Sequence, residues 1–390
     1  MLLTILTFLV VLGILVFVHE LGHFFVARRS GVRVEEFGFG LPPRIFGFYK
    51  DPSRKIWKYV GKNTHDCPTT IYSINWVPLG GFVRIKGEQG ENIQDTDSFA
   101  HKPIYKKIII LSAGVTMNVL LAIILLSIGY IIGLPREIDD SAQLPWAKIS
   151  NEMIYINEVV KDYPADKAGI KAGDIIESVD KTKFSNIADL QNYISKKNNV
   201  PLELSIKRNE ENIVLNVTPI DDEKNNKVIM GVMLAKMGFV SYPWYIAFWE
   251  GFKTTMFLIK EILIAFYMLF VNIITTHTVS VSLSGPVGIA VITGQVAKMG
   301  FIYILQFTAL LSLNLAIINF LPLPALDGGR VMFLLIEKIR GKAINPRIEA
   351  TIHNIGLYLL FLLVLIITYS DVMRFSDKFV LLWQKITNLF

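Results

Sequence analysis

Four apolar runs constrain this chain more than any other feature of its sequence. They occupy about residues 2–27, 104–134, 301–323 and 352–368. Each is about as long as, or longer than, the roughly 20 residues that an α-helix needs to cross the hydrocarbon core of a bilayer. The hydrophobic fraction of 52% and the mean hydropathy of +0.45 agree with this interpretation. We therefore expect a polytopic α-helical membrane protein with about four core transmembrane helices.

Basic residues at the ends of these runs predict an orientation. They follow the first run, precede the second and separate the third from the fourth: Arg28, Arg29, Arg33, Lys102, Lys106, Lys107, Lys338, Arg340, Lys342 and Arg347. The positive-inside rule places these three regions in the cytosol, so residues 135–242 and both termini are expected outside it. Topology therefore accounts for the net charge of +6, and we expect no nucleic-acid partner.

One further stretch, residues 242–276, leaves the number of spans open. Its apolar centre at residues 262–274 is only about 13 residues long and follows Lys260 and Glu261. A single crossing here would also place the basic loops on opposite sides of the membrane. We therefore expect a helix in the outer membrane interface, with a full span as the alternative.

The sequence His-Glu-Leu-Gly-His at residues 19–23 carries the strongest chemical signal. His19 and His23 are four residues apart, so both imidazoles lie on one face of a helix and can reach one ion. Zinc binds neutral imidazole, and Glu20 can take a proton from water at such a site. Ionisable residues next to an apolar run are costly and usually functional, which favours a metal site over a chance match. We therefore expect the first run to be a retained helix rather than a cleaved signal peptide.

A third metal ligand is expected, because catalytic zinc normally has three protein ligands. Asp327 is the candidate, and a helix-capping role is the alternative. His19 precedes Arg28 by nine residues, or about 14 Å of helix, and Asp327 precedes Lys338 by eleven. The two motifs should therefore lie at a similar depth, toward the cytosolic side.

Prolines predict that the third run is broken just before Asp327. Pro322 and Pro324 cannot both occupy an ordinary helix interior. Broken backbone at membrane depth is tolerated only around a buried or wet cavity. Asn314 and Asn319 lie nearby, and each could orient substrate or merely bond the freed carbonyl groups; we favour a functional role for Asn319.

Residues 71–86 predict two short β-strands around a turn at residues 78–81. Cys67 is the one cysteine in the chain, so no intrachain disulfide can form. We expect it to be a lone thiol in a polar loop, and a metal site with His65 and Asp66 is the alternative.

Together these motifs resemble the site-2 protease family of intramembrane zinc metalloproteases, most closely its bacterial branch that regulates sigma-E. The resemblance covers nearly the whole chain and rests on residues 19–23, 38–40, 78–83, 284–288 and 319–329. It implies that Zn²⁺ is bound by His19, His23 and Asp327, and that Glu20 is the general base.

The same resemblance implies where and on what the protein acts. It implies residence in the bacterial cytoplasmic (inner) membrane and hydrolysis of peptide bonds within or near transmembrane segments of membrane-anchored substrates. Anti-sigma factors and remnant signal peptides are typical of such substrates. Substrate handling is assigned to Asn319, Pro322, Gly80 and Gly81. Residues 71–86 would form a membrane-reentrant β-hairpin whose edge could pair with an unwound substrate segment.

The soluble region resembles a PDZ domain. The motif lies at residues 163–176 (YPADKAGIKAGDII), and the expected extent is residues 150–220, outside the cytosol. A PDZ groove binds an extended peptide, for which residues 154–157 are our candidate loop; a role as a size filter is the equal alternative. The chain departs from the sigma-E branch in having one PDZ domain rather than two and an insertion at residues 49–70 without an evident role.

These expectations divide the chain into five regions. They are an N-terminal membrane catalytic region (1–134), the PDZ domain (150–220), a linker with a membrane-associated helix (221–300), a C-terminal membrane catalytic region (301–370) and an amphipathic tail (371–390). Two rival classes are a metal transporter and a catalytically silent membrane scaffold. A transporter needs ligands along a path, whereas these converge at one depth. The intact HExxH motif with Asp327 argues against the scaffold.

Overall fold

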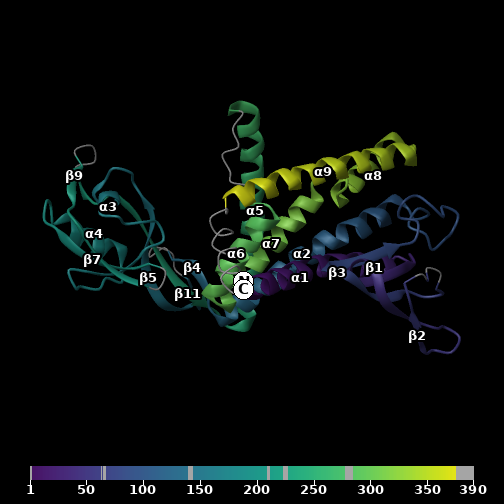
Figure 1. Cartoon of the computed structure of the whole chain (residues 1–390), viewed down its shortest axis with the longest axis horizontal. Coiled ribbons are helices and arrows are strands. Elements are labelled where there is room, and N and C mark those ends of the chain that lie inside the picture. Colours follow the sequence, from purple (N-terminus) through teal and green to yellow (C-terminus); the bar gives the residue numbers. More distant parts are fainter. Residues whose placement is uncertain are drawn as a thin grey trace, which may run out of the picture. The chain divides into compact units, whose positions relative to one another are not determined.

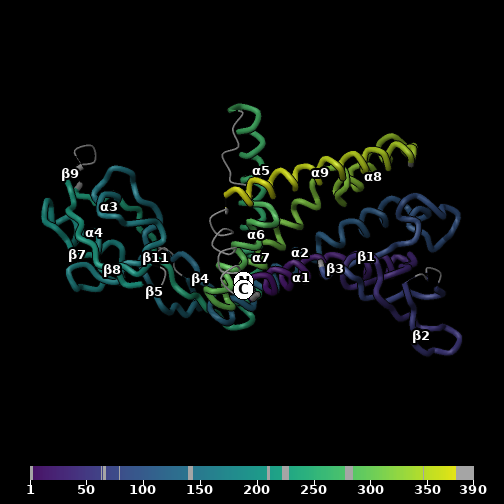
Figure 2. The backbone as a smooth tube through the Cα atoms, in the orientation of Figure 1, coloured from purple at the N-terminus to yellow at the C-terminus, as the bar shows by residue number. Residues whose placement is uncertain are grey.

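The computed structural model describes residues 2–374 except 63, 65–66, 139–143, 209–210, 223–226 and 277–283. The chain divides into two compact units, one formed by residues up to Ser127 and from Phe248 onward, the other by Ile128–Ala247. Figure 1 labels most elements of both units, and Figure 2 traces the backbone through them. Most of the predicted tail, from residue 375 onward, lies outside the described residues.

Five helices in the described part of the chain are long and apolar enough to cross a membrane. They are α1 (Leu2–Arg29), α2 (Ile104–Ile132), α5 (Trp244–Thr276), α7 (Phe301–Phe320) and α9 (Pro346–Arg374). Neither α1 nor α2 contains a proline, which fits their unbroken backbone. Four of the five cover most or all of the predicted apolar runs, so the helical, membrane-type class is confirmed.

Helix α5 corrects one step of the sequence analysis. The apolar stretch was taken as about 13 residues because counting stopped at Lys260 and Glu261. The helix is 33 residues long, since apolar and aromatic residues upstream of that charged pair continue it back to Trp244. The length argument against a span was therefore wrong, and the placement of α5 in the membrane interface stays a prediction.

A three-stranded sheet in the first unit has the order β2-β1-β3. Its strands are β1 (Val34–Lys50), β2 (Trp57–Val60) and β3 (Ile71–Ile85). Phe37 of β1 has two partners, Tyr72 and Val83, so the two arms of β3 flank the first half of β1. The predicted hairpin is therefore corrected: the arms pair with β1 and not with each other.

The core of the first unit joins this sheet to α1, α2 and α8 (Asp327–Arg340). Phe24 of α1 packs against Phe37 with their ring centroids 4.6 Å apart. Gly80 and Gly81 of β3 lie directly on α1. A Cβ added at Gly80 would be 2.3 Å from the Val16 side chain, and one added at Gly81 would be 3.0 Å from the Phe17 Cα. The strand backbone can therefore approach the helix only without side chains at these positions.

The predicted break between α7 and α8 is confirmed. Helix α7 ends at Phe320, and α8 begins at Asp327 after a turn that contains Ala325 at φ +75°. Gly328 and Gly329 let the start of α8 fold back on this turn, because an added Cβ would lie 2.3 Å or less from carbonyl oxygens of Phe320, Leu321 and Leu323.

Helix α6 (Pro286–Met299) explains the motif at residues 284–288. Its N-cap is Gly285, which has no side chain to accept from the first N–H groups. The buried carboxylate of Asp371, in α9, accepts from the Gly288 nitrogen at 2.7 Å instead. Small residues in the motif therefore serve the contact between α6 and α9.

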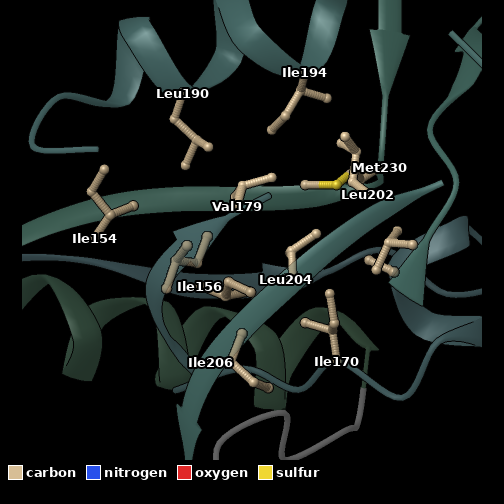
Figure 3. Packing of buried hydrophobic residues seen from close by; sticks show 13 residues of the cluster. Ile154, Ile156, Ile170, Val179, Leu190, Ile194, Leu202, Leu204, Ile206 and Met230 are labelled. Atoms are coloured by element: carbon tan, nitrogen blue, oxygen red, sulfur yellow. The ribbon is translucent and has the colours of Figure 1, made fainter. Parts of the chain in front are cut away.

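The second unit is built on a six-stranded sheet of order β4-β11-β5-β6-β7-β8. Its strands are β4 (Leu134–Glu137), β5 (Lys148–Val159), β6 (Ile175–Val179), β7 (Leu202–Arg208), β8 (Glu211–Val217) and β11 (Val232–Ser241). A separate pair is formed by β9 (Ile220–Asp222) and β10 (Lys227–Ile229), and the helices are α3 (Pro164–Lys167) and α4 (Ile187–Ser195). Figure 3 shows Leu190 and Ile194 reaching from α4 toward the sheet, where they join Ile156, Leu204 and the rest of one apolar core.

This unit differs from the predicted PDZ limits of residues 150–220. Strands β4 and β11 lie outside those limits and belong to the same sheet, so the predicted linker begins too early. The candidate peptide loop at residues 154–157 was also wrong. It lies within β5, where Ile154 has Lys236 on one side and Ile176 on the other, so neither edge is free to add a strand.

Candidate active site

Helix α1 brings two histidines together in the first unit. His19 and His23 are both 6% exposed, and their Nε2 atoms lie 3.2 Å apart. A separation of four residues is close to one helical turn, so both rings leave the same face. Glu20 follows His19 directly and lies on the wall of the adjoining cavities.

Asp327, the first residue of α8, completes the cluster. Its Oδ2 atom lies 3.1 Å from Nε2 of His19 and 3.3 Å from Nε2 of His23. The three donor atoms therefore form a nearly equilateral triangle. Ligand atoms about 2.05 Å from a tetrahedral zinc ion lie about 3.3 Å from one another. Two imidazoles and a carboxylate at this spacing fit a zinc ion.

Helix α2 forms the floor of the cluster at Gly114. A Cβ atom there would lie 2.5 Å from Nε2 of His23 and 2.7 Å from Nε2 of His19. Gly22 of α1 lies equally close to α2, since its added Cβ would be 2.5 Å from the Ala113 carbonyl oxygen. The sequence analysis did not single out Gly114; small residues where two helices cross are the signal that could have found it.

The second nitrogen of each imidazole faces a polar group of α2. Nδ1 of His23 lies 2.8 Å from the carbonyl oxygen of Ile110 and donates to it when Nε2 binds a metal. Nδ1 of His19 lies 3.4 Å from the side-chain amide of Asn118, which is fully buried. The sequence analysis also missed Asn118; a polar residue within an apolar run was the available signal.

Two cavities meet at the cluster, and Glu20 lines both. The first, of about 210 Å³, is also lined by Gly81 and Glu88. The second, of about 220 Å³, is lined by Asn319 and Leu326. His19 and Asp327 border both cavities as well. A carboxylate is thus placed between the donor cluster and the space in which a substrate and a water molecule could meet.

The four residues expected to handle substrate have different positions. Gly81 lines the first cavity, and its added Cβ would lie 3.1 Å from the side chain of Glu20. Asn319 lines the second cavity. Gly80 is seated on α1 rather than in a cavity lining, and Pro322 is exposed in the turn and lines neither cavity.

The sequence left alternatives open for Asn314 and for Cys67. The side chain of Asn314 donates to the carbonyl of Leu310 at 3.1 Å, within the unbroken helix α7, so it bonds its own helix and not a carbonyl group freed by the break. Cys67 is buried, while His65 and Asp66 lie outside the described residues, so their metal-site alternative stays a prediction.

A helix-borne HExxH pair that meets an aspartate from a distant helix break, within a set of long apolar helices, defines a metalloprotease of the membrane type. The sequence comparisons agree with this class. The chain belongs to peptidase family M50, whose family profile matches residues 7–363. The predicted site-2 protease family and the assignment as a zinc metalloendopeptidase are therefore confirmed.

Curated relatives match along almost their whole length. The regulator of sigma-W protease RasP from Bacillus subtilis is 30% identical, over 95% of this chain and 98% of the relative. The zinc metalloprotease RasP from Geobacillus kaustophilus is 29% identical, over 95% of this chain and 98% of the relative. Among solved structures, the PDZ domain of an SdrC-like protein from Listeria monocytogenes is 23% identical over 22% of this chain and 92% of that chain, with a TM-score of 0.21.

Proposed function

We propose that this protein is an intramembrane zinc metalloprotease that cleaves membrane-anchored proteins within or near their transmembrane segments. The observation that carries the proposal is the triangle of His19, His23 and Asp327 beside Glu20, which lies among long apolar helices and borders two cavities. Relatives named as zinc metalloproteases support zinc as the ion.

The residues divide the chemistry between binding and proton transfer. His19, His23 and Asp327 would hold the ion. Zinc bound there would act as a Lewis acid toward the scissile carbonyl and would acidify water. Glu20 takes the proton of the attacking water and gives it to the departing amine nitrogen, as a general base and then a general acid. Its position beside both cavities puts it within reach of either group.

The second arm of β3, Gly81–Ile85, is the proposed docking edge for the segment of the substrate that is cleaved. A transmembrane helix hides its carbonyl groups, so it must unwind before it can be hydrolysed, and strand addition stabilises the extended form. Residues Gly81–Ile85 pair with β1 on one side, and among the described residues no strand pairs with their other side. Gly81 lies next to Glu20, so a strand added here would pass the catalytic carboxylate. We assign Asn319, on the second cavity, to binding the same segment from the opposite wall, and we retain Gly80 and Pro322 as residues that shape the two approaches.

The second unit is proposed to be an extracytoplasmic PDZ-like domain, with the active site toward the cytosolic side, as the basic loops predict. Strand β4 pairs with only Met237–Val240 of β11. Among the described residues no strand pairs with this edge of β11 at Val232–Ala235, and α4 lies close to the same strand. This edge replaces residues 154–157 as the place for an extended peptide.

The natural substrate is proposed to be a membrane-anchored regulator, such as an anti-sigma factor, or a remnant signal peptide. The relative named as a regulator of sigma-W protease favours the first class. A bacterial inner-membrane location follows from the same relatives and from the apolar helices.

The test is cleavage of a membrane-anchored reporter by purified wild type and Glu20→Gln, with zinc measured in both. The amide keeps the size of the side chain but cannot accept the proton, so cleavage should fall by a factor of about 10²–10⁴ while zinc content is unchanged. Equal cleavage by the two proteins would exclude Glu20 as the base. Wild type that carries no zinc would contradict the metal site. Zinc without cleavage of any reporter would favour the scaffold class.

A further inference from the structure

The insertion at residues 49–70 contains a hairpin whose two faces differ. In the register between β1 and β2, Phe48 lies opposite Tyr59 and Lys50 lies opposite Trp57. Side chains two residues apart on a strand point to the same side, so these four share one face. Tyr49 points to the opposite face, where it packs against the buried residues Val60, Cys67 and Ile71.

Buried charges hold this hairpin on the sheet. Arg44 and Glu36 are 6% and 3% exposed and form two hydrogen bonds, of 2.8 and 2.6 Å. Nη1 of Arg44 also donates to the carbonyl oxygens of Gly61 and Thr64, at 3.1 and 2.7 Å. The guanidinium therefore ties the chain just after β2 to β1, which helps to hold the hairpin and its outward face in place.

The outward face is aromatic and uncovered. Phe48, Trp57 and Tyr59 are 42%, 58% and 67% exposed, and the rings of Phe48 and Tyr59 meet edge to face with centroids 5.9 Å apart. Trp57 also contacts Tyr72 at 5.8 Å. Large aromatic side chains clustered in this way on one face are typical of an interaction surface.

This face lies beside the basic end of α1. The ring of Tyr72 contacts Phe24 of α1, and its hydroxyl accepts a hydrogen bond of 3.3 Å from Arg28. Helix α1 covers the sheet at Tyr72, and the exposed aromatic face continues from there. If α1 crosses the membrane, Arg28 and Arg29 mark its end, so the aromatic face lies at the level of the membrane–water interface.

The same segment is strongly basic. Residues 50–62 contain five basic side chains against one acid, Asp51, which Lys58 already neutralises at 2.5 Å. The other four, Lys50, Arg54, Lys55 and Lys62, are exposed. Exposed charges at this density exclude burial in hydrocarbon, and their sign is complementary to anionic lipid headgroups.

We propose that the β1–β2 hairpin binds the anionic headgroup layer of the membrane surface beside α1. The rings of Phe48, Trp57 and Tyr59 enter the interface, and Lys50, Arg54 and Lys55 contact lipid phosphates. The hairpin thereby holds the sheet, and with it the proposed substrate edge of β3, at a fixed height relative to the bilayer. The inference depends on α1 being a membrane helix and not on the proteolytic activity.

The first test places a fluorescent label at Tyr59→Cys in a Cys67→Ala background of the full chain, reconstituted into vesicles that carry a headgroup-level quencher. The matched control is Val214→Cys, also on a strand and 59% exposed, in the second unit. With about one-third phosphatidylglycerol, quenching at position 59 should be at least about twofold stronger than in pure phosphatidylcholine. It should weaken in high salt and in an Arg54→Glu/Lys55→Glu variant, whereas the label at position 214 should not respond.

A second measurement uses the unaltered chain. Trypsin should cut after Arg54 and Lys55 more slowly in anionic than in neutral vesicles, while cleavage in the second unit proceeds equally in both. Absence of quenching at position 59, with no protection from trypsin, would overturn the proposal and leave the face to a protein partner. Equal quenching in neutral and anionic vesicles, insensitive to the charge reversal, would also overturn it, because apolar burial alone would then explain the contact.

Discussion

The Nδ1 atom of His353, in α9, accepts a hydrogen bond of 2.9 Å from the backbone nitrogen of Ala325. Ala325 has φ +75°, in the left-handed region that costs a residue with a Cβ about 1–2 kcal/mol. Gly356, one turn further along α9, lies against Pro324, where an added Cβ would fall 2.3 Å from the proline ring. Helix α9 therefore holds the turn that presents Asp327 two residues later.

Replacement of His353 should weaken the metal site from a distance. In His353→Ala the Ala325 nitrogen loses its acceptor and the turn relaxes, so zinc affinity should fall about 10-fold, with a similar loss of cleavage. His353→Asn keeps an acceptor near the place of Nδ1 and should retain most affinity. Zinc affinity is measured by competition with a chelator.

A second substitution tests the cause of that loss. Glycine adopts positive φ without strain, so Ala325→Gly should restore part of the affinity in the His353→Ala background and change little alone. If the double variant binds zinc no better than His353→Ala, the role of the histidine in holding this turn is wrong.

Gly114→Ala should disable the metal site, although Gly114 lines neither of the two cavities. The new methyl group would overlap both imidazoles, at 2.5 Å from Nε2 of His23 and 2.6 Å from Cε1 of His19. We expect zinc affinity to fall by at least about 100-fold, because ligand atoms must move out of the tetrahedral arrangement. Zinc content after dialysis and reporter cleavage both measure this.

The matched control is Gly13→Ala, on helix α1. An added Cβ there meets only Phe39, at an ordinary contact distance of 3.9 Å. Alanine is also the better helix former, so this variant should bind zinc and cleave normally. Full zinc content in Gly114→Ala would contradict the prediction and would show that α1 and α2 can separate here at little energetic cost.

The helical part of the fold and the residues that meet at the candidate metal site were predictable because each depends on local pattern. Long apolar runs become helices, and His19 and His23 are placed by helical periodicity alone. Asp327 could be predicted as a candidate because the prolines before it indicate a break in the apolar helix. The full length of the apolar helix α5 was missed because the count stopped at Lys260 and Glu261, although two adjacent charges are compatible with a long helix.

The pairing of strands that are distant in the sequence could not be predicted from local patterns. The two arms of β3 look like a hairpin in sequence, but β1 lies between them, and no local signal shows which strand intervenes. The PDZ-like limits failed for the same reason, because β11 returns to pair with β5 across most of the unit. Gly114 and Asn118 acquire their roles only through the crossing of α1 and α2.

Asn118 should set the orientation of His19. When Nε2 binds the metal, the proton of the neutral ring is on Nδ1 and needs an acceptor, which the Asn118 amide can supply by presenting its oxygen. The hydroxyl of Ser312 donates to the Asn118 backbone carbonyl at 2.8 Å and fixes this part of α2. Asn118→Leu should lower zinc affinity about 10–100-fold, and Asn118→Asp, which also accepts, should lower it less.

Asn314→Leu is the matched control for that prediction, since among the described residues the Asn314 amide bonds only Leu310 of its own helix. It should leave zinc affinity within about twofold of wild type. Similar losses in Asn118→Leu and Asn314→Leu would mean that removing any polar side chain from these helices weakens the site, and the specific role of Asn118 would be excluded.

The second unit should lose stability in acid through Asp174, the aspartate of the Gly-Asp-Ile-Ile sequence. Asp174 is 1% exposed; its carboxylate accepts two hydrogen bonds of 2.7 Å from Arg208 and one of 2.8 Å from the Lys171 nitrogen. Burial alone would raise the pKa of Asp174, but these donors outweigh it and lower the pKa below its usual value.

Because the folded pKa lies below the unfolded value of about 3.9, the unfolded chain takes up the proton first as the pH falls. The stabilisation is therefore complete above about pH 5 and is lost as the pH falls through the folded pKa. Asp174→Asn should destabilise the unit by about 1–3 kcal/mol near neutral pH, and the difference from wild type should shrink in acid. Hydrogen exchange of the amides in β6 and β7 of the full chain, compared between variant and wild type at each pH, measures this difference.

Glu177→Gln, at an exposed position on β6, is the charge-matched control and should follow wild type throughout. A destabilisation by Asp174→Asn that is the same at all pH values would show that the lost hydrogen-bond geometry, and not the ionised carboxylate, carries the effect.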